Sequence, residues 1–190
     1  MKKNILLALF LLSAITISAQ NVWKNDAANS YLGFSITHLG IADVPGHFDK
    51  YDVKITSSKS DFSDAVIEMT ADVNSINTRV TARDNHLKSA DFFDGAKYPT
   101  MTFVSTSVKN NGKNKYLLTG DLSMHGVTKT VTVNMLYRGS VKKPNQQKQT
   151  AGIQITGTIK RSDFGVGNSF PPPMLSDEIQ ILANGELIQQ

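Results

Sequence analysis

Residues 116–124 read Tyr-Leu-Leu-Thr-Gly-Asp-Leu-Ser-Met, and this stretch indicates the fold of the chain. From Leu118 to Met124, apolar or small residues occupy every second position and polar residues stand between them. Successive side chains of a β-strand point to opposite faces of a sheet, so such a segment has one apolar and one polar face. The stretch therefore predicts a strand whose apolar side faces a packed interior.

The same two-residue period recurs along most of the chain. It is found at residues 31–37, 51–55, 65–73, 131–137, 153–159 and 179–183. A weaker run at 101–108 has Met101 and Phe103 on one side and Val104 and Val108 on the other. About eight strands with at most one helix predict an all-β antiparallel sandwich or barrel. The even strand number favours a closed eight-stranded barrel, because closure leaves no unpaired edge.

The composition excludes several classes of function. The chain has 190 residues, 40% of them apolar, which suits one domain with a packed core. The absence of cysteine excludes disulfides, thiolate metal ligands and a cysteine nucleophile. The formal net charge is +4 and falls to +2 without Lys2 and Lys3. So small a charge does not indicate a nucleic-acid binder.

The first 19 residues have the layout of a secretory signal peptide. Lys2 and Lys3 precede an apolar run at 5–12, and smaller residues follow up to Ala19. The run is too short to span a bilayer as a permanent anchor, although an uncleaved anchor is the alternative. We predict cleavage after Ala19, a mature domain at residues 20–190, and a periplasmic or secreted protein.

Several residues on the predicted inward faces are small: Ala65, Ala71, Gly120, Gly157 and Ala183. Small inward residues leave volume that bulky ones would fill, and a barrel of about eight strands can hold one small ligand. Alternatively, these residues mark strand bends or sites of tight packing. No charged residue lies on the inward faces of the central runs, so any cavity should be apolar.

Residues 77–99 break the alternation and contain a predicted short helix, capped by Asn77 or Thr78. One face of this helix would carry three basic residues, Arg79, Arg83 and His86. Such a stripe suits a phosphate or carboxylate group. Alternatively, Arg83 only holds the loop in place by pairing with Asp84, Asp91 or Asp94.

Residues 78–99, TRVTARDNHLKSADFFDGAKYP, resemble the characteristic motif of the YceI-like family of polyisoprenoid-binding proteins. Four further blocks agree in order: FSITHLG with VPGHF within residues 34–48, GDLSMHGVTK at 120–129, RSDFG at 161–165 and SDEI at 176–179. Met124 and the three prolines at 171–173 depart from the family pattern. The resemblance implies an extended, lipocalin-like eight-stranded barrel with a helix near one end. It also implies binding of long isoprenoid or other amphipathic lipid chains outside the cytoplasm.

We therefore predict an exported carrier or sequestering protein for a long apolar chain. Burial of a fifteen-carbon chain would contribute on the order of 10 kcal/mol before the costs of binding. The predicted lining residues are Phe34, Ile36, Ile67, Met69, Phe103, Leu118, Leu122, Val133 and Ile155. The predicted mouth residues are Phe92, Phe93 and Phe164, and the predicted head-group residues are Arg83, His86 and Arg161. A shift of one residue in register would exchange inside for outside.

Two other classes of function stay open. An enzyme or metal-dependent protein could use a rim formed by His38, His86 and His125. However, the chain has no His-Glu-x-x-His or Gly-x-Ser-x-Gly motif, so we assign no catalytic residue, metal or cofactor. A structural or interaction module would use its surface instead of its interior. The oligomeric state is also open, with a homodimer as one alternative.

Overall fold

The structure, a computed structural model, describes residues 20–144 and 147–190. The predicted signal peptide at residues 1–19 lies outside the described residues. The described chain is mostly sheet and contains one α-helix, α1 at Thr81–Lys88, with two short 3-10 helices, η1 at Val73–Ser75 and η2 at Arg161–Phe164. The strands are β1 (Asn21–His38), β2 (Ala42–Phe48), β3 (Tyr51–Ser57), β4 (Val66–Asp72), β5 (Ile76–Asn77), β6 (Thr100–Asn110), β7 (Lys115–Met124), β8 (Val127–Lys142), β9 (Gln149–Lys160) and β10 (Leu175–Gln189).

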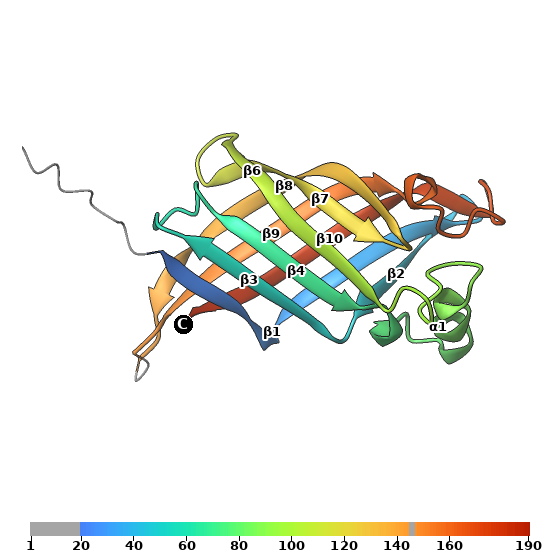
Figure 1. Ribbon diagram of the computed structural model, residues 1–190, viewed down its shortest axis with the longest axis horizontal. Coiled ribbons are helices and arrows are strands. Elements are labelled where there is room, and N and C mark those ends of the chain that lie inside the picture. The colour runs from blue at the N-terminus through green and yellow to red at the C-terminus, as the bar shows by residue number, and fades with distance from the viewer. Residues whose placement is uncertain (1–19, 145–146) are drawn as a thin grey trace, which may run out of the picture.

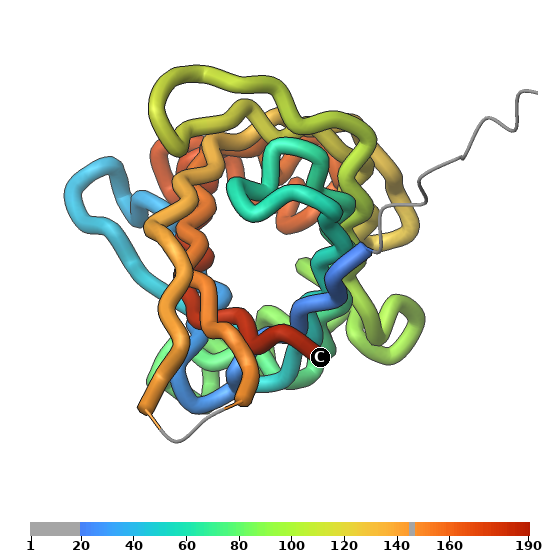
Figure 2. Tube along the Cα trace, turned by 90° about the vertical axis from the view of Figure 1, so that its left-hand side faces the viewer, coloured from blue at the N-terminus to red at the C-terminus, as the bar shows by residue number. Residues whose placement is uncertain are grey.

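Eight of these strands close into a barrel. Antiparallel pairing runs from β1 through β3, β4, β6, β7, β8, β9 and β10, and β10 pairs again with β1. Figure 1 shows the long, tilted strands, and Figure 2 shows the ring that they form. The short strand β2 pairs with the second half of β1, and β5 pairs with β2. The predicted eight-stranded antiparallel barrel with a helix near one end is confirmed.

A bulge in β6 explains why residues 101–108 alternate weakly. The register against β7 shifts between Ser105 and Ser107, so β6 has one extra residue there. An extra residue exchanges the two faces of a strand from that point onward. Val104 is exposed, whereas Val108 lies opposite the buried Leu118 and packs against the core. The prediction that Val104 and Val108 share one face is therefore wrong.

The small inward residues do not all leave empty space. A β-carbon on Gly120 would lie 2.5 Å from the Phe103 ring and 2.5 Å from the Val104 carbonyl oxygen. A β-carbon on Gly157 would meet the Val133 side chain at the same distance. These glycines therefore mark tight packing, which is the second of the two alternatives. Ala183, by contrast, lines an internal cavity.

Aromatic side chains pack across the barrel end that holds the start of β1. Phe62, from the loop between β3 and β4, has its ring centroid 5.2 Å from that of Trp23 on β1 and 5.2 Å from that of Tyr137 on β8. Since β1 and β8 are not neighbouring strands, Phe62 reaches across the bore. Phe62 is fully buried, so this cluster plugs the barrel at the end opposite α1.

Candidate functional site

The barrel encloses a cavity of about 510 Å³. All eight strands of the ring contribute lining residues, and most of them are aliphatic or aromatic. No aspartate or glutamate is found among the described residues that line it. Its size falls within the range of about 300–1,000 Å³ that is typical of sites for one small-molecule ligand. The interior thus contains an apolar chamber and is not a fully packed core.

The structure brings most of the sequence-predicted residues to this cavity. The nine predicted lining residues all border it, namely Phe34, Ile36, Ile67, Met69, Phe103, Leu118, Leu122, Val133 and Ile155. Phe92, Phe93, Arg83, His86 and Arg161 border it as well. The two-residue period placed the lining residues on the inner face, because side chains of a strand alternate. Contact of any of these residues with a ligand stays a prediction.

Phe164 is the exception, and its predicted place at the mouth is wrong. It ends the η2 turn, is only 1% exposed and does not border the cavity. Its backbone carbonyl is hydrogen-bonded to His125 Nδ1 at 3.0 Å. Gly165 follows in the left-handed region, with φ of 71°, and this turn leaves the Phe164 ring packed in the core.

Sequence reasoning missed several lining residues. Tyr51 and Val53 belong to a strand that was recognised, so the alternation could have placed them inside. Phe170 and Met174 lie in the irregular segment between η2 and β10, which has no period to indicate a face. Only the tertiary structure brings that segment over the cavity.

Arg161 is a buried cation that holds this segment in place. All five N–H donors of its guanidinium go to backbone carbonyls, those of Ser176, Val166, Gly167, Phe170 and Leu175. Arg161 is 6% exposed, and burial lowers the pKa of its guanidinium although nearby Asp177 opposes this effect. With every donor used, Arg161 has none left for the head group that the sequence analysis assigned to it.

The helix begins later than predicted. Val80 is its N-cap and gives no side-chain hydrogen bond, and Arg79 precedes it with a φ of 66°. Arg79 is exposed and outside the helix, so it does not share a helical face with Arg83 and His86. The predicted stripe of three basic residues is therefore reduced to Arg83 and His86.

Arg83 is held by Thr78 and not by a carboxylate. Its Nε donates to Thr78 Oγ1 and its Nη2 to the Thr78 carbonyl, each at 2.8 Å. In the part of the chain that the structure describes, Arg83 forms no ion pair. Asp84 accepts hydrogen bonds from Thr78, and Asp91 bonds to His86 at 3.0 Å. The alternative that Arg83 pairs with Asp84, Asp91 or Asp94 is therefore not found.

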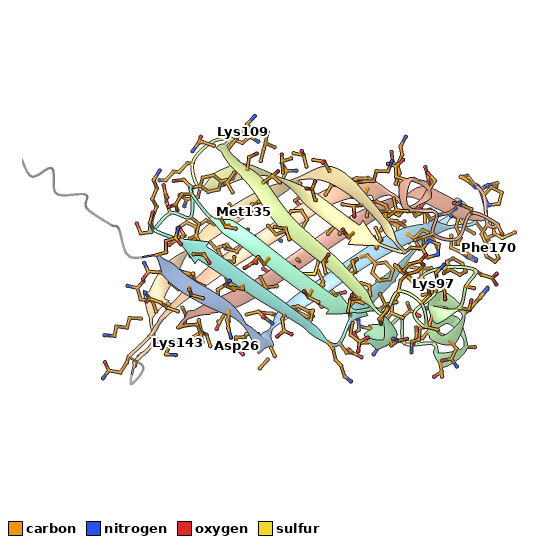
Figure 3. All side chains as sticks on the ribbon, in the orientation of Figure 1. Asp26, Lys97, Lys109, Met135, Lys143 and Phe170 are labelled. Atoms are coloured by element: carbon orange, nitrogen blue, oxygen red, sulfur yellow. The ribbon has the colours of Figure 1, made fainter. Side chains whose placement is uncertain are left out.

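An aromatic group lies over the cavity at the α1 end. Phe92 stacks on Phe170 with centroids 4.9 Å apart and rings inclined by 13°. His86 meets both rings edge-on at 4.9 and 5.5 Å. Figure 3 places Phe170 at this end of the barrel. His38, His86 and Met174 border the cavity here and are also exposed, which marks this end as the mouth.

The histidines do not form a joint site. His86 is bonded to Asp91, and His125 to the Phe164 carbonyl. Across residues 20–144 and 147–190, no three His, Cys, Asp or Glu side chains gather closely enough to hold a metal ion. Nothing in this geometry favours the metal-dependent rim of His38, His86 and His125. Within the described ranges, no helix is long and apolar enough to cross a membrane.

Fold and cavity together define the class of protein, a lipocalin-like closed barrel with an apolar internal chamber. Residues 23–187 match the YceI-like domain, and the chain belongs to this family. UPF0312 proteins of Staphylococcus aureus strains MSSA476 and USA300 are 39% and 40% identical to it over 141 residues. This alignment covers 74% of this chain and 80% of each relative.

Solved structures of similar proteins share the fold. BcnA of Burkholderia cenocepacia is 28% identical, with a TM-score of 0.74 over 87% of this chain and 99% of that one. A YceI protein of Campylobacter jejuni is 33% identical, with a TM-score of 0.73 over 80% and 89% of the two chains. A polyisoprenoid-binding domain of Saccharophagus degradans is 16% identical, with a TM-score of 0.66 over 88% and 97%. At that identity, the last likeness is one of fold alone.

Proposed function

We propose that this protein is an exported carrier or sequestering protein that holds one long-chain isoprenoid or similar amphipathic lipid in its barrel. The observation that carries the proposal is the enclosed apolar cavity of about 510 Å³. The side chains around a cavity of this size have fewer protein contacts than those of a close-packed core. A bound hydrocarbon chain restores that packing and removes its own surface from water, at about 0.8 kcal/mol per CH₂.

Membership of the YceI-like family supports a binding role in preference to a catalytic one. The domain from Saccharophagus degradans that is described as polyisoprenoid-binding has the same fold. Its low identity gives no information on the ligand of this chain. The cavity's own chemistry is therefore the main support, since the wall is apolar and its charged side chains are cationic.

The two ends of the chamber differ in a way that suits an amphiphile. Trp23, Phe62 and Tyr137 plug one end, where an apolar tail would terminate. Arg83 and His86 border the cavity at the other end, beside solvent. A chain entering tail-first would leave its polar head near Arg83. A cation with unused N–H donors favours a negatively charged or strongly hydrogen-bond-accepting group there.

Export is part of the proposal and rests on residues 1–19 alone. The test is the intact mass of the protein recovered from the periplasm or medium of its own host. A mass that corresponds to a chain beginning at Gln20 supports export and the predicted cleavage. Full-length protein retained in the cytoplasm contradicts it.

Native mass spectrometry of gently purified protein tests the binding role directly. We expect an adduct of lipid mass with one ligand per chain, and organic extraction should remove it. The same spectra report whether the protein is a monomer or a homodimer. Protein that carries no adduct, and takes up none when incubated with prenols or fatty acids, would contradict the proposal.

A matched pair of variants in β10 tests whether the ligand binds inside the barrel or on its outer surface. Ala183 borders the cavity, whereas its neighbour Leu182 is exposed on the outer face. Ala183→Trp should fill the chamber and abolish the adduct, and Leu182→Trp should leave it unchanged. Equal loss in both variants, or in neither, would argue against an internal ligand.

A further inference from the structure

Two exposed loops at the mouth of the barrel carry apolar side chains and no charge. The β1–β2 turn, residues 38–42, reads His-Leu-Gly-Ile-Ala, and residues 171–174, before β10, read Pro-Pro-Pro-Met. Every residue of both segments is exposed, with Ile41 at 84%, Leu39 at 53% and Met174 at 47%. We call these two segments the rim loops. Exposed apolar residues usually occur singly, so such a cluster calls for an explanation.

The rim loops form one continuous surface. The Leu39 backbone N–H donates to the Met174 carbonyl oxygen at 3.0 Å, and a β-carbon on Gly40 would lie 3.9 Å from the Pro173 side chain. Both loops lie at the same end of the barrel as α1 (Figure 1). His38 and Met174 also border the cavity, so the exposed apolar surface continues into the apolar chamber.

The stability of the barrel does not explain a leucine at position 39. Its φ of 53° lies in the left-handed region, where glycine, asparagine or aspartate is favoured over a bulky apolar residue. The β6–β7 turn, at the barrel end opposite α1, has the usual turn chemistry, since residues 111–114 read Asn-Gly-Lys-Asn and Asn114 has a φ of 57°. Leu39 is unfavourable in both its backbone and its exposure, which indicates a role in contact with something outside the barrel.

We propose that the rim loops dock on a lipid bilayer with neutral head groups, and that Leu39, Ile41 and Met174 insert into its surface. This inference rests on the proposed function, since a long-chain lipid resides in bilayers and has to reach the mouth from there. The lack of charge in both loops supports docking, because a charged side chain would lose its hydration on insertion. Neither loop contains Lys or Arg, and Asp43 adjoins the first loop, so attraction to anionic lipids plays no part.

Co-sedimentation with vesicles tests the docking. Exported protein that begins at Gln20 is used, because the apolar run at residues 5–12 would itself bind lipid. We expect weak binding to phosphatidylcholine vesicles, half-complete at on the order of 1 mM lipid, and no tighter binding when phosphatidylglycerol is added. The double variant Leu39→Asn/Ile41→Ser should weaken this binding by at least about tenfold, because it removes two of the three inserting side chains.

The double variant Val66→Ser/Val141→Ser is the matched control. These valines are 46% and 62% exposed and lie at the barrel end opposite α1. This variant should bind vesicles as the wild-type protein does. Neither Leu39 nor Ile41 borders the cavity, so the rim-loop variant should keep the wild-type affinity for hexadecanol. Displacement of the fluorescent apolar dye N-phenyl-1-naphthylamine measures that affinity.

A fluorescent label reports insertion at a single position. The chain has no cysteine, so Ile41→Cys provides one attachment site for a nitrobenzoxadiazole fluorophore. Its emission should shift to shorter wavelength when phosphatidylcholine vesicles are added, because the label enters a less polar medium. The same label on Val141→Cys should show no shift, since Val141 lies at the other end of the barrel.

The outcomes separate this inference from the proposed function. Wild-type protein that does not sediment with vesicles at about tenfold higher lipid concentration would overturn the docking, as would equal binding by the rim-loop variant. A homodimer that the rim-loop variant dissociates would show that the loops join two copies of the chain, and the docking would again be wrong. In each of these cases the carrier role stands if hexadecanol displaces the dye. If hexadecanol does not displace it, the proposed function fails, whatever the vesicles show.

Discussion

Arg83 grips Thr78 through two hydrogen bonds, from Nε to the threonine Oγ1 and from Nη2 to its carbonyl oxygen, each 2.8 Å long. These two hydrogen bonds fix the position of the guanidinium. The group has five N–H donors, and Nη1 makes no hydrogen bond among the described contacts. Arg83 also borders the cavity, so we propose that its fixed guanidinium receives an anionic head group there.

Arg83→Gln should therefore weaken the binding of palmitate by about tenfold, while hexadecanol binding changes little, because only the anion gains a charge-assisted hydrogen bond. Dye displacement with both probes measures the difference. Arg79→Gln is the control, since Arg79 is exposed and does not border the cavity. Equal weakening of both probes in Arg83→Gln would mean that Arg83 only supports the loop.

Arg161→Lys should lower the free energy of unfolding by about 3 kcal/mol, because lysine cannot satisfy five buried carbonyls with three donors. Urea denaturation measures the change. Arg138→Lys, at an exposed arginine bonded to Gln154, should cost less than about 0.5 kcal/mol. A stable Arg161→Lys variant that binds palmitate poorly would instead restore the head-group role.

Gly120→Ala should destabilise the barrel by about 1–3 kcal/mol, because the new methyl group would overlap the Phe103 ring and the backbone of Val104. Thermal denaturation is a suitable measurement. Gly152→Ala is the matched control on β9, where the nearest atom to the new carbon is in the Arg138 side chain at 3.3 Å. Similar melting temperatures for the two variants would show that Gly120 is not a point of tight packing.

Asp64 should give the protein a pH-dependent contribution to stability. Burial alone would raise the pKa of Asp64, but hydrogen bonds from Ser57, Ser58 and the Lys59 backbone outweigh it and lower the pKa to about 2. A carboxyl group with a lowered pKa in the folded state stabilises that state above its ordinary pKa, near 3.9. This stability is fully present at neutral pH and is lost as the pH falls from about 5 to 2.

Asp64→Asn should accordingly reduce the free energy of unfolding at pH 7 by about 1 kcal/mol. The difference from the wild-type protein should shrink steadily between pH 5 and pH 2. Urea denaturation at several pH values measures it, with the exposed Asp52→Asn of β3 as control. A difference that is constant with pH would show that the charge of Asp64 is not the cause.

Alternation along the sequence predicted the strands and the inward faces with few errors. Leu118 and Leu122, two residues of an apolar face, both border the cavity, as do the other predicted lining residues. The pattern worked because it is local, since a strand places every second side chain on one face. The alternation assigned Val108 to the wrong face because the bulge in β6 adds one residue, and nothing in the residue types of the strand indicates a bulge.

The sequence by itself determined a closed antiparallel barrel with an apolar inner face, because period, turns and strand number are properties of the chain read in order. The tertiary structure alone decided which inner residues face a chamber and which fill space. Gly120 and Ala183 look alike in the pattern, yet one accommodates the Phe103 ring and the other borders the cavity. Likewise, only the tertiary structure shows that the Arg161 guanidinium donates to five backbone carbonyls. Packing and hydrogen bonding bring together residues that are distant in sequence, so a local sequence pattern does not indicate these contacts.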